Sequence, residues 1–517
     1  MEPPMPLARA RTRTDRLLDT IERAGNLIPH PTLLFVALAV AVLVLSALAA
    51  RARIAVTHPL SGATVQVVDL LTADGLRRIL TSAVTNFTGF APLGVVLVAM
   101  LGIGVAERAG LIAALLARLV EAAPGRLLTL CVVLAAVLSS IAGDAGIVVL
   151  PPLAAITFQA AGRHPIAGLI ATYVGVGAGF SANLLIGPSD ALLAGISTEA
   201  VALVDPAYRV NAAGNWWFII ASTVLVTLFC SWITERVTEP RLGPWSPTGE
   251  QGPGAEAEPT ARPEGRDRGL RAAGFVTGLL ALLLLLGLVP TDGVLRDPAT
   301  GSVLASPFMN GIVVVIALWA ASAGIAYGYA VGTFRSAADV VEGMESTMRT
   351  LSVYLVLIFF AAQFVAWFDW TNLGVVLAVN GASTLQSLGL DALPLLVALV
   401  LLVALINLFL GSQSAKWAIM GPIFVPMFFL VGISPEATQM AYRIGDSCTN
   451  IITPLIPYLG LVVAIARRYE PRTGLGTLIA AMAPYSAALL VTWSGLLALW
   501  VLLDLPLGPG APIQLPG

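Results

Sequence analysis

The stretch GSQSAKWAIMGPIFVP, residues 411–426, interrupts an apolar part of the chain with small polar residues, one lysine and two prolines. A second interrupted stretch, RIGDSCTNIITPLIP at residues 443–457, follows it closely. In hydrocarbon a backbone group without a hydrogen-bond partner costs several kcal/mol, so a helix breaks inside a membrane only where protein or water satisfies the freed groups. The two stretches therefore predict broken helices around a polar site within the membrane.

The first half of the chain carries the same kind of interruption twice. Its two stretches are SSIAGDAGIVVLPPL at residues 139–153 and GVGAGFSANLLIGPSD at residues 175–190. In each half a small polar cluster precedes an apolar run that ends in proline, and a second polar cluster with Asn and Pro follows. Paired breaks at matching positions of two halves indicate the binding site of a secondary transporter. Kinks used only for packing are the alternative, because Gly and Pro are common in membrane helices.

The composition indicates a membrane protein. Of the 517 residues, 57% are hydrophobic and 11% are charged, whereas a soluble chain carries about 25% charged residues. The net charge of −2 shows no basic bias toward nucleic acid, so we expect no nucleic-acid partner. The three isolated cysteines form no metal or disulfide pattern, and the sequence contains no HExxH, GxSxG or P-loop motif. We therefore expect neither an enzyme nor a bound cofactor.

These observations predict an all-α polytopic membrane protein with two halves. Runs of about 20 apolar residues, the length needed for each crossing, recur along the chain. Three arginine-rich regions flank them, and the positive-inside rule places these regions, including the N-terminus, in the cytoplasm. The predicted parts are a cytoplasmic amphipathic segment at 1–30, a first membrane half at 31–238 with a hairpin at about 127–160, a disordered cytoplasmic linker at 239–271, a second membrane half at 272–504 with a hairpin at about 392–430, and an external tail at 505–517.

Five charged residues lie in the broken segments. A charge at the centre of a bilayer costs about 2.5–3.5 kcal/mol on insertion scales, so each needs a partner or a water path. The five residues are Asp144, Asp190, Lys416, Arg443 and Asp446. Their clustering at the breaks predicts that they line a solute pathway.

Arg443, Asp446 and Asn450 form the strongest group, because their i, i+3, i+7 spacing places them on one face of a helix. The oxygens of Asp446 and Asn450 suit Na⁺ or a transferred proton. The guanidinium of Arg443 offers a two-pronged donor to a carboxylate. The alternative is that Arg443 and Asp446 only neutralise each other.

The remaining candidates lie in the other polar clusters. Lys416 and Ser414 lie at the expected hairpin tip, where they offer an ammonium and a hydroxyl. The adjacent Trp417 would stack on an aromatic substrate or serve only in packing. Asn183 is the first-half counterpart of these polar residues. Asn407, within a leucine-rich span, ligates an ion or bonds a neighbouring helix.

The motifs SAKW, YRIGDS and TPLIPY, with the opening DRLLDTIERAGNLIPHPTLLF, resemble the AbgT family of p-aminobenzoyl-glutamate transporters over nearly the whole chain. The resemblance implies a homodimer in the lipid bilayer of the bacterial inner membrane. Each protomer would have about nine transmembrane helices and two re-entrant helical hairpins in an inverted repeat. The expected activity is ion-gradient-driven transport of a small molecule, either uptake of p-aminobenzoyl-glutamate or efflux of sulfonamides and p-aminobenzoate.

The resemblance also assigns residues. The family's functional positions match this sequence in residue type at Asp190, Ser414, Trp417, Pro435, Arg443 and Asp446. The polar clusters in which related folds bind Na⁺ contain Asn183, Asn407 and Asn450, so Asp446 with Asn450 is the candidate Na⁺ site.

The substrates that the resemblance implies are aromatic, and p-aminobenzoyl-glutamate also carries two carboxylates, which fits these side chains. We expect Arg443 and Lys416 to bind anionic groups and Trp417 to bind the ring. Pro435 would set the start of the helix that bears Arg443.

Two other functions stay open from the residues alone. A cation/proton antiporter with the same inverted-repeat plan would need an acidic pair but no arginine donor for an anion. An intramembrane enzyme would need a nucleophile–base pair, yet no histidine lies near Ser414 in the sequence. The residues do not decide between Na⁺ and H⁺, since Asp446 suits either ion.

Overall fold

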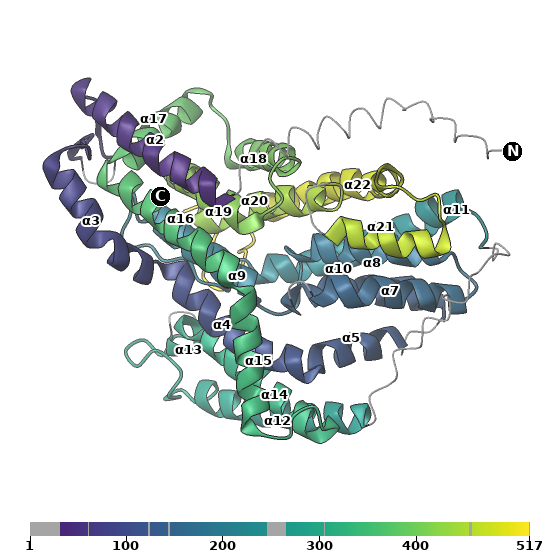
Figure 1. Cartoon of the computed structure of the whole chain (residues 1–517). Helices are drawn as coiled ribbons and strands as arrows, with labels where there is room; N and C mark the ends of the chain where they lie inside the picture. Colours follow the sequence, from purple (N-terminus) through teal and green to yellow (C-terminus); the bar gives the residue numbers. More distant parts are fainter. Residues whose placement is uncertain are drawn as a thin grey trace, which may run out of the picture.

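Helices make up almost all of the structure, a computed structural model that describes residues 31–59, 62–121, 125–142, 145–245, 265–303, 306–453 and 458–515 (Figure 1). The predicted segment 1–30 lies outside the described residues. The strands in the described part are β1 (Ala55–Thr57) and β2 (Thr64–Gln66), which pair antiparallel. The prediction of an all-α polytopic protein is confirmed.

Seven helices in the described part are long and apolar enough to cross a membrane. They are α2 (Pro31–Arg51), the continuous pair α3 (Ala73–Thr88) and α4 (Ala91–Ala109), α10 (Trp216–Ile233), α12 (Arg266–Leu288), α14 (Ile312–Val331), α16 (Ser352–Trp370) and α22 (Leu475–Leu502). Helix α10 continues through a π-helical turn (Thr234–Thr238) into α11 (Glu239–Leu242). Shorter helices connect the spans: α5 (Leu111–Glu121), α13 (Pro307–Asn310), α15 (Ala337–Thr350) and α17 (Leu373–Ser387).

Two series of short helices repeat the same order. The first is α6 (Leu128–Leu138), α7 (Ala145–Ala160), α8 (Pro165–Gly179) and α9 (Pro188–Val201), followed by the long α10. The second is α18 (Ala392–Asn407), α19 (Gln413–Phe429), α20 (Pro435–Asn450) and α21 (Tyr458–Tyr469), followed by the long α22. Their breaks fall at the four interrupted stretches, so the predicted repeat is present. Its inverted orientation and the re-entrance of the hairpins stay predictions.

The short helices cannot each cross a bilayer. The 11 residues of α6 extend over only about 16 Å, against a hydrocarbon core of about 30 Å. Helices α17 and α18 form a pair bent by 119°, which brings the number of spans in the described part to eight if the pair is one crossing. The count of about nine stays a prediction.

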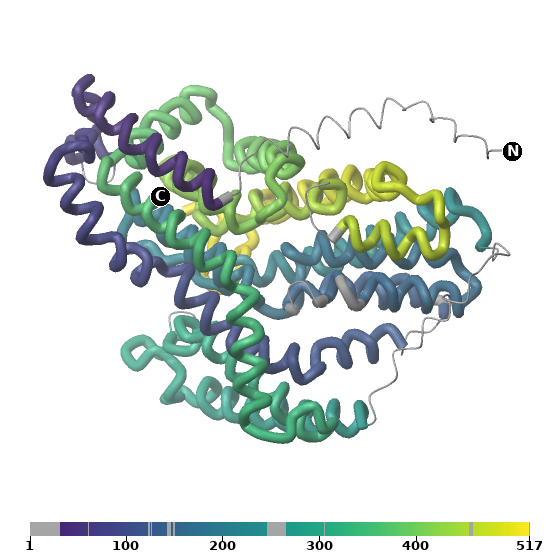
Figure 2. The backbone as a smooth tube through the Cα atoms, viewed as in Figure 1, coloured from purple at the N-terminus to yellow at the C-terminus, as the bar shows by residue number. Residues whose placement is uncertain are grey.

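The repeats interlock at the centre of the molecule. Helix α8 packs against both α6 and α7, and α20 packs against both α18 and α19. Helix α9 of the first half packs against α19 of the second. Figure 1 shows α9, α18, α19 and α20 between two groups of helices, one formed by α2, α3 and α16 and the other by α7, α8, α10, α21 and α22. In Figure 2 the yellow end of the chain, α21 and α22, runs beside the blue helices α8 and α10.

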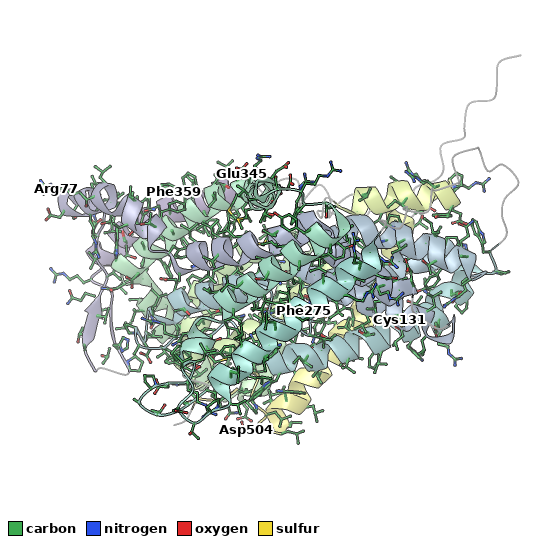
Figure 3. All side chains as sticks on the ribbon, turned by 90° about the horizontal axis from the view of Figure 1, so that it is seen from below. Arg77, Cys131, Phe275, Glu345, Phe359 and Asp504 are labelled. Atoms are coloured by element: carbon green, nitrogen blue, oxygen red, sulfur yellow. The ribbon has the colours of Figure 1, made fainter. Side chains whose placement is uncertain are left out.

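The exterior is apolar. Phe275, labelled on α12 in Figure 3, is 74% exposed, and leucines along the same helix are also exposed. Large exposed apolar surfaces are rare on soluble monomers. The lipid bilayer is therefore the solvent of these helix faces.

Local sequence explains where the central helices begin. Proline is the first residue of α8, α9 and α20, a position at which its missing N–H costs nothing. At α20 the side chain of Ser434 also accepts a hydrogen bond from the backbone N–H of Ala437 over 3.1 Å. Pro435 is thus the first residue of α20, as expected, and its part in the substrate site stays a prediction.

The predicted linker at 239–271 is wrong at both ends, where the structure has helix. Glu239 in α11 accepts two hydrogen bonds from Arg163, and Arg266 in α12 forms an ion pair with Glu121 over 2.6 Å. These pairs hold residues that composition alone assigned to a linker. Residues 246–264 lie outside the described part.

The tail at 505–517 also has defined contacts in its described part. Ser434 donates its backbone N–H to the carbonyl of Ile513 over 2.9 Å, and Leu515 donates to that of Gly432 over 2.8 Å. The tail therefore packs against the start of α20. Its position outside the membrane stays a prediction.

We predict that Gly445→Ala destabilises the protein, because a methyl group there would overlap the backbone of α18 at Val400. Overpacking of this kind costs about 1–3 kcal/mol. The control is Gly495→Ala on α22, where the added methyl meets no heavy atom within 4 Å. Thermal unfolding in detergent, followed by tryptophan fluorescence, measures both variants. Equal unfolding temperatures would contradict the close packing of α18 and α20.

Candidate functional site

Helix α20 is the centre of the candidate site. Every residue from Pro435 to Asn450 is buried, although the helix carries Arg443, Asp446 and Asn450. The polar groups of such a helix need partners on neighbouring helices, because an unpaired buried charge is very costly. Arg443 and Asp446 each have a separate charged partner, and Glu436, also buried on this helix, accepts a hydrogen bond from the hydroxyl of Tyr208 over 2.9 Å.

Arg443 pairs with Asp190 of the first half. Its Nη1 donates to Oδ1 of Asp190 over 2.5 Å, and its Nη2 donates to the carbonyl of Phe180 over 3.0 Å. The second carboxylate oxygen of Asp190 accepts the backbone N–H of Gly187, which caps α9. Asp190 therefore neutralises Arg443 and also fixes the start of a helix.

Asp446 pairs with Lys416 at the start of α19. The ammonium of Lys416 donates to Oδ1 of Asp446 and to Oδ1 of Asn407, and the side chains of Lys416 and Asp446 are fully buried. The alternative that Arg443 and Asp446 neutralise each other is therefore wrong. Lys416, predicted to bind substrate, lies instead beside the residues predicted to bind the ion.

The predicted ion ligands of the second half form one cluster. Asn450 donates through Nδ2 to Oδ2 of Asp446 over 3.1 Å. Asn407 donates through Nδ2 to Oδ1 of Asn450 over 2.8 Å and to Oγ1 of Thr449 over 2.9 Å. The structure thus brings Asn407, Asp446 and Asn450 together.

Asn183 lies on the other side of the site, with Arg443. Its Nδ2 donates to Oγ of Ser140 over 2.8 Å, and both side chains line a small pocket with Asp190 and Arg443. The pocket volume is about 10 Å³, which is room for about one water molecule. Asp144, the remaining first-half candidate, lies outside the described residues.

Trp417 is held by protein contacts in this conformation. Its ring lies 4.5 Å from that of Tyr442, measured between centroids, and it is fully buried. Its indole Nε1 donates to Oγ of Ser197 over 3.0 Å. The neighbouring Ser414 lies close to Ser412, with 3.4 Å between the hydroxyl oxygens.

Sequence reasoning missed several polar residues of the site. Ser447 on α20 donates to Ser181 over 2.6 Å, which joins the two halves directly. Ser197 donates to Gln439 over 2.8 Å and accepts from Trp417. Ser181 and Ser447 stand within the quoted interrupted stretches, so their position was a usable signal. Ser197 and Gln439 lie on regular helices, and no feature of the sequence marked them as site residues.

Residues 16–515 match the model of the family described as "AbgT putative transporter family". The chain belongs to the AbgT family. The resemblance seen in the sequence is therefore confirmed, and this AbgT-family chain is a multi-pass membrane transporter.

Relatives of this AbgT-family chain match it along almost its whole length. The p-aminobenzoyl-glutamate transport protein of Escherichia coli (strain K12) is 40% identical over 499 residues, which are 96% of this chain and 97% of that protein. The solved YdaH transporter of Alcanivorax borkumensis, described as having an unusual topology, is 52% identical with a TM-score of 0.87, over 93% of this chain and 100% of YdaH. Neisseria gonorrhoeae MtrF, described as illuminating a class of antimetabolite efflux pumps, is 46% identical with a TM-score of 0.90, over 96% of this chain and 100% of MtrF.

We predict strong coupling between Asp190 and Arg443 in this AbgT-family chain. Asp190→Asn and Arg443→Gln should each lower the free energy of unfolding by about 3–5 kcal/mol, because each leaves a buried charge unpaired. The double variant should lose clearly less than the sum of the two. Denaturation in detergent measures all three variants.

The exposed pair Glu345 and Arg349 on α15 is the control, since surface pairs contribute only about 0.2–1 kcal/mol. Additive losses at Asp190 and Arg443 would show that the two side chains are not energetically paired.

Proposed function

We propose that this chain is an ion-gradient-driven secondary transporter of p-aminobenzoyl-glutamate or related aromatic carboxylates and sulfonamides, by uptake or efflux. The proposal draws on the names of two relatives, one a p-aminobenzoyl-glutamate transport protein and the other an antimetabolite efflux pump. We also propose that the transporter is a homodimer in the bacterial inner membrane, with its N-terminus in the cytoplasm. The family resemblance supports the homodimer and the inner membrane, and the positive-inside rule supports the cytoplasmic N-terminus.

One observation carries the substrate assignment. The guanidinium of Arg443 is buried, and its Nε has no hydrogen-bond partner among the described residues. A buried N–H without a partner costs about 1–3 kcal/mol, and it lies on a side chain that lines the small polar pocket. Guanidinium groups bind carboxylates with paired hydrogen bonds. An anionic group of the substrate would satisfy this free donor.

The aromatic part of the substrate would meet Trp417. In the described conformation the ring of Trp417 is covered by Tyr442, and the pocket beside Arg443 is far smaller than an aminobenzoyl group. Substrate entry therefore requires α9, α19 and α20 to separate. Discontinuous helices around a central site suit such alternating access.

The ion side of the proposed site is the cluster of Asp446, Asn407 and Asn450. Carboxylate and amide oxygens suit Na⁺, and the carboxylate also suits a transferred proton. Asn183, beside Arg443, is the first-half candidate for the same role. The second candidate function, cation/proton antiport, uses this cluster, but it supplies no anion that would bind the free Nε donor of Arg443.

The test is transport by purified protein in proteoliposomes. We expect labelled p-aminobenzoyl-glutamate or a labelled sulfonamide to accumulate only under an imposed Na⁺ or proton gradient. Arg443→Lys keeps the charge but removes the planar donor, so flux should fall about tenfold or more. Arg349→Lys, on the exposed α15, is the matched control and should transport at the wild-type rate.

Two outcomes contradict the proposal. Ion exchange that runs at full rate without any organic substrate would favour the antiporter. Equal substrate flux through Arg443→Lys and the wild type would remove Arg443 from the substrate site.

A further inference from the structure

Glu436 is a buried acid that the proposed substrate and ion sites do not use. It is the second residue of α20 and is only 4% exposed. Its Oε2 accepts a hydrogen bond from the hydroxyl of Tyr208 over 2.9 Å. Gly214 lies against the same side chain, since a Cβ there would come within 2.9 Å of Cγ of Glu436. Glu436 differs in this from Asp190 and Asp446, which each face a buried cation.

The elements packed around Glu436 bring no positive charge to it. Helices α8, α10, α18 and α22 and the tail at 505–515 carry no charged residue. The charged residues of α9, of the loop that follows it and of α19 are Asp190, Glu199, Asp205, Arg209 and Lys416. Arg209 donates to two carbonyls of its own loop, and Lys416 pairs with Asp446. Within the described part of the chain, Glu436 is thus buried without an ion pair.

The neutral acid suits this environment better than the carboxylate. A carboxylate has about four acceptor positions, and two donors reach this one, the hydroxyl of Tyr208 and the backbone N–H of Glu436 itself. The first turn of a helix attracts an anion, but this effect is small beside the lost hydration of a buried charge. The hydroxyl of Tyr208 can also donate to the carbonyl oxygen of a neutral acid. Burial without a countercharge therefore favours a bound proton.

Glu436 lies where α9 and α20 are joined, beside the tail that is predicted to be external. Tyr208 belongs to the loop that follows α9. One turn along α20, Gln439 accepts a hydrogen bond from Ser197 of α9 over 2.8 Å. We call these two contacts, Tyr208 with Glu436 and Ser197 with Gln439, the external gate. Substrate entry by separation of α9 and α20 would break both contacts and expose Glu436 to water.

We propose that Glu436 is a proton-binding site of the external gate, which holds a proton while the gate is closed and releases it to external water when the gate opens. The proton passes from a carboxyl oxygen of Glu436 to water, and Tyr208 keeps its own proton. The inference rests on the proposed function, because the gate closes one end of the same transport route. Acid therefore favours the closed gate, and alkali favours the open one.

Infrared spectroscopy of the full-length protein in lipid tests for the bound proton. Spectra are compared at mildly acidic and mildly alkaline pH, because exposed carboxylates stay ionised in this window. The wild type should lose the C=O band of a neutral carboxyl group at alkaline pH, and Glu436→Gln should lack that band. Tyr208→Phe should shift the band without removing it, since it deletes the hydroxyl that donates to Glu436. The control Glu345→Gln, an exposed acid on α15, should match the wild type.

Transport provides a readout that a purely structural role would not change. Exchange of labelled p-aminobenzoyl-glutamate is measured in proteoliposomes with the same pH on both sides, so that no proton gradient acts. Wild-type exchange should rise about fivefold or more from acidic to alkaline pH, the lower end of coupling between two ligand sites. Glu436→Gln imitates the neutral acid, so its exchange should stay slow and lose this pH dependence. Glu345→Gln should follow the wild type.

Equal infrared spectra of Glu436→Gln and the wild type would overturn the inference, and so would equal pH profiles of exchange. If Glu436→Gln does not fold, Tyr208→Phe decides, because a carboxyl band that does not shift belongs to another residue. Failure of the proposed function looks different: the wild type then exchanges none of the tested substrates at any pH. The infrared band still reports whether Glu436 holds a proton.

Discussion

The structure depends on the neutralisation of two charges on one buried helix. Helix α20 has no exposed residue, yet it carries Arg443 and Asp446. Neither charge is tolerable in that environment without a partner. Asp190 of the first half satisfies Arg443, and Lys416 of the second half satisfies Asp446. The ion pair between Arg443 and Asp190 therefore forms only when the first half folds against α20, and it joins the two repeats at the centre of the molecule.

The breaks in the helices follow from the same requirement. Oppositely charged groups can meet at membrane depth only where backbone ends and small side chains leave space for polar atoms. The carbonyl of Phe180, freed at the end of α8, accepts from Arg443. The hydroxyls of Ser181 and Ser447 form a hydrogen bond across the two halves. The break between α8 and α9 thus provides a backbone carbonyl that an unbroken helix would have used internally.

The sequence alone predicts local features of the helices, but it does not identify which residues pair with one another across the structure. The spacing of Arg443, Asp446 and Asn450 depends only on helix periodicity, and the breaks depend only on backbone chemistry, so both could be predicted. The partner of Arg443 lies 253 positions away, and no local pattern identifies it. The sequence predicts a substrate role for Lys416 because an ammonium at a hairpin tip suits an anion. A residue at such a tip can face either the substrate side or the ion side of the site, and only packing decides which. The helical ends of the predicted linker were missed because their ion pairs to Arg163 and Glu121 are not visible in composition.

The geometry offers a physical link between substrate and ion. A carboxylate that binds the free Nε of Arg443 would share this guanidinium with Asp190, which also caps α9 through Gly187. Helix α9 packs against α19, the helix that carries Lys416. Lys416 in turn neutralises Asp446, which lies one helical turn from Arg443 on the same face of α20. These contacts connect the ion pair of Arg443 and Asp190 to the ion pair of Lys416 and Asp446 through α9, α19 and α20. Two sites are coupled when a ligand at one changes the relative stability of conformations at the other, and these contacts are the route by which the proposed substrate and ion sites would be coupled.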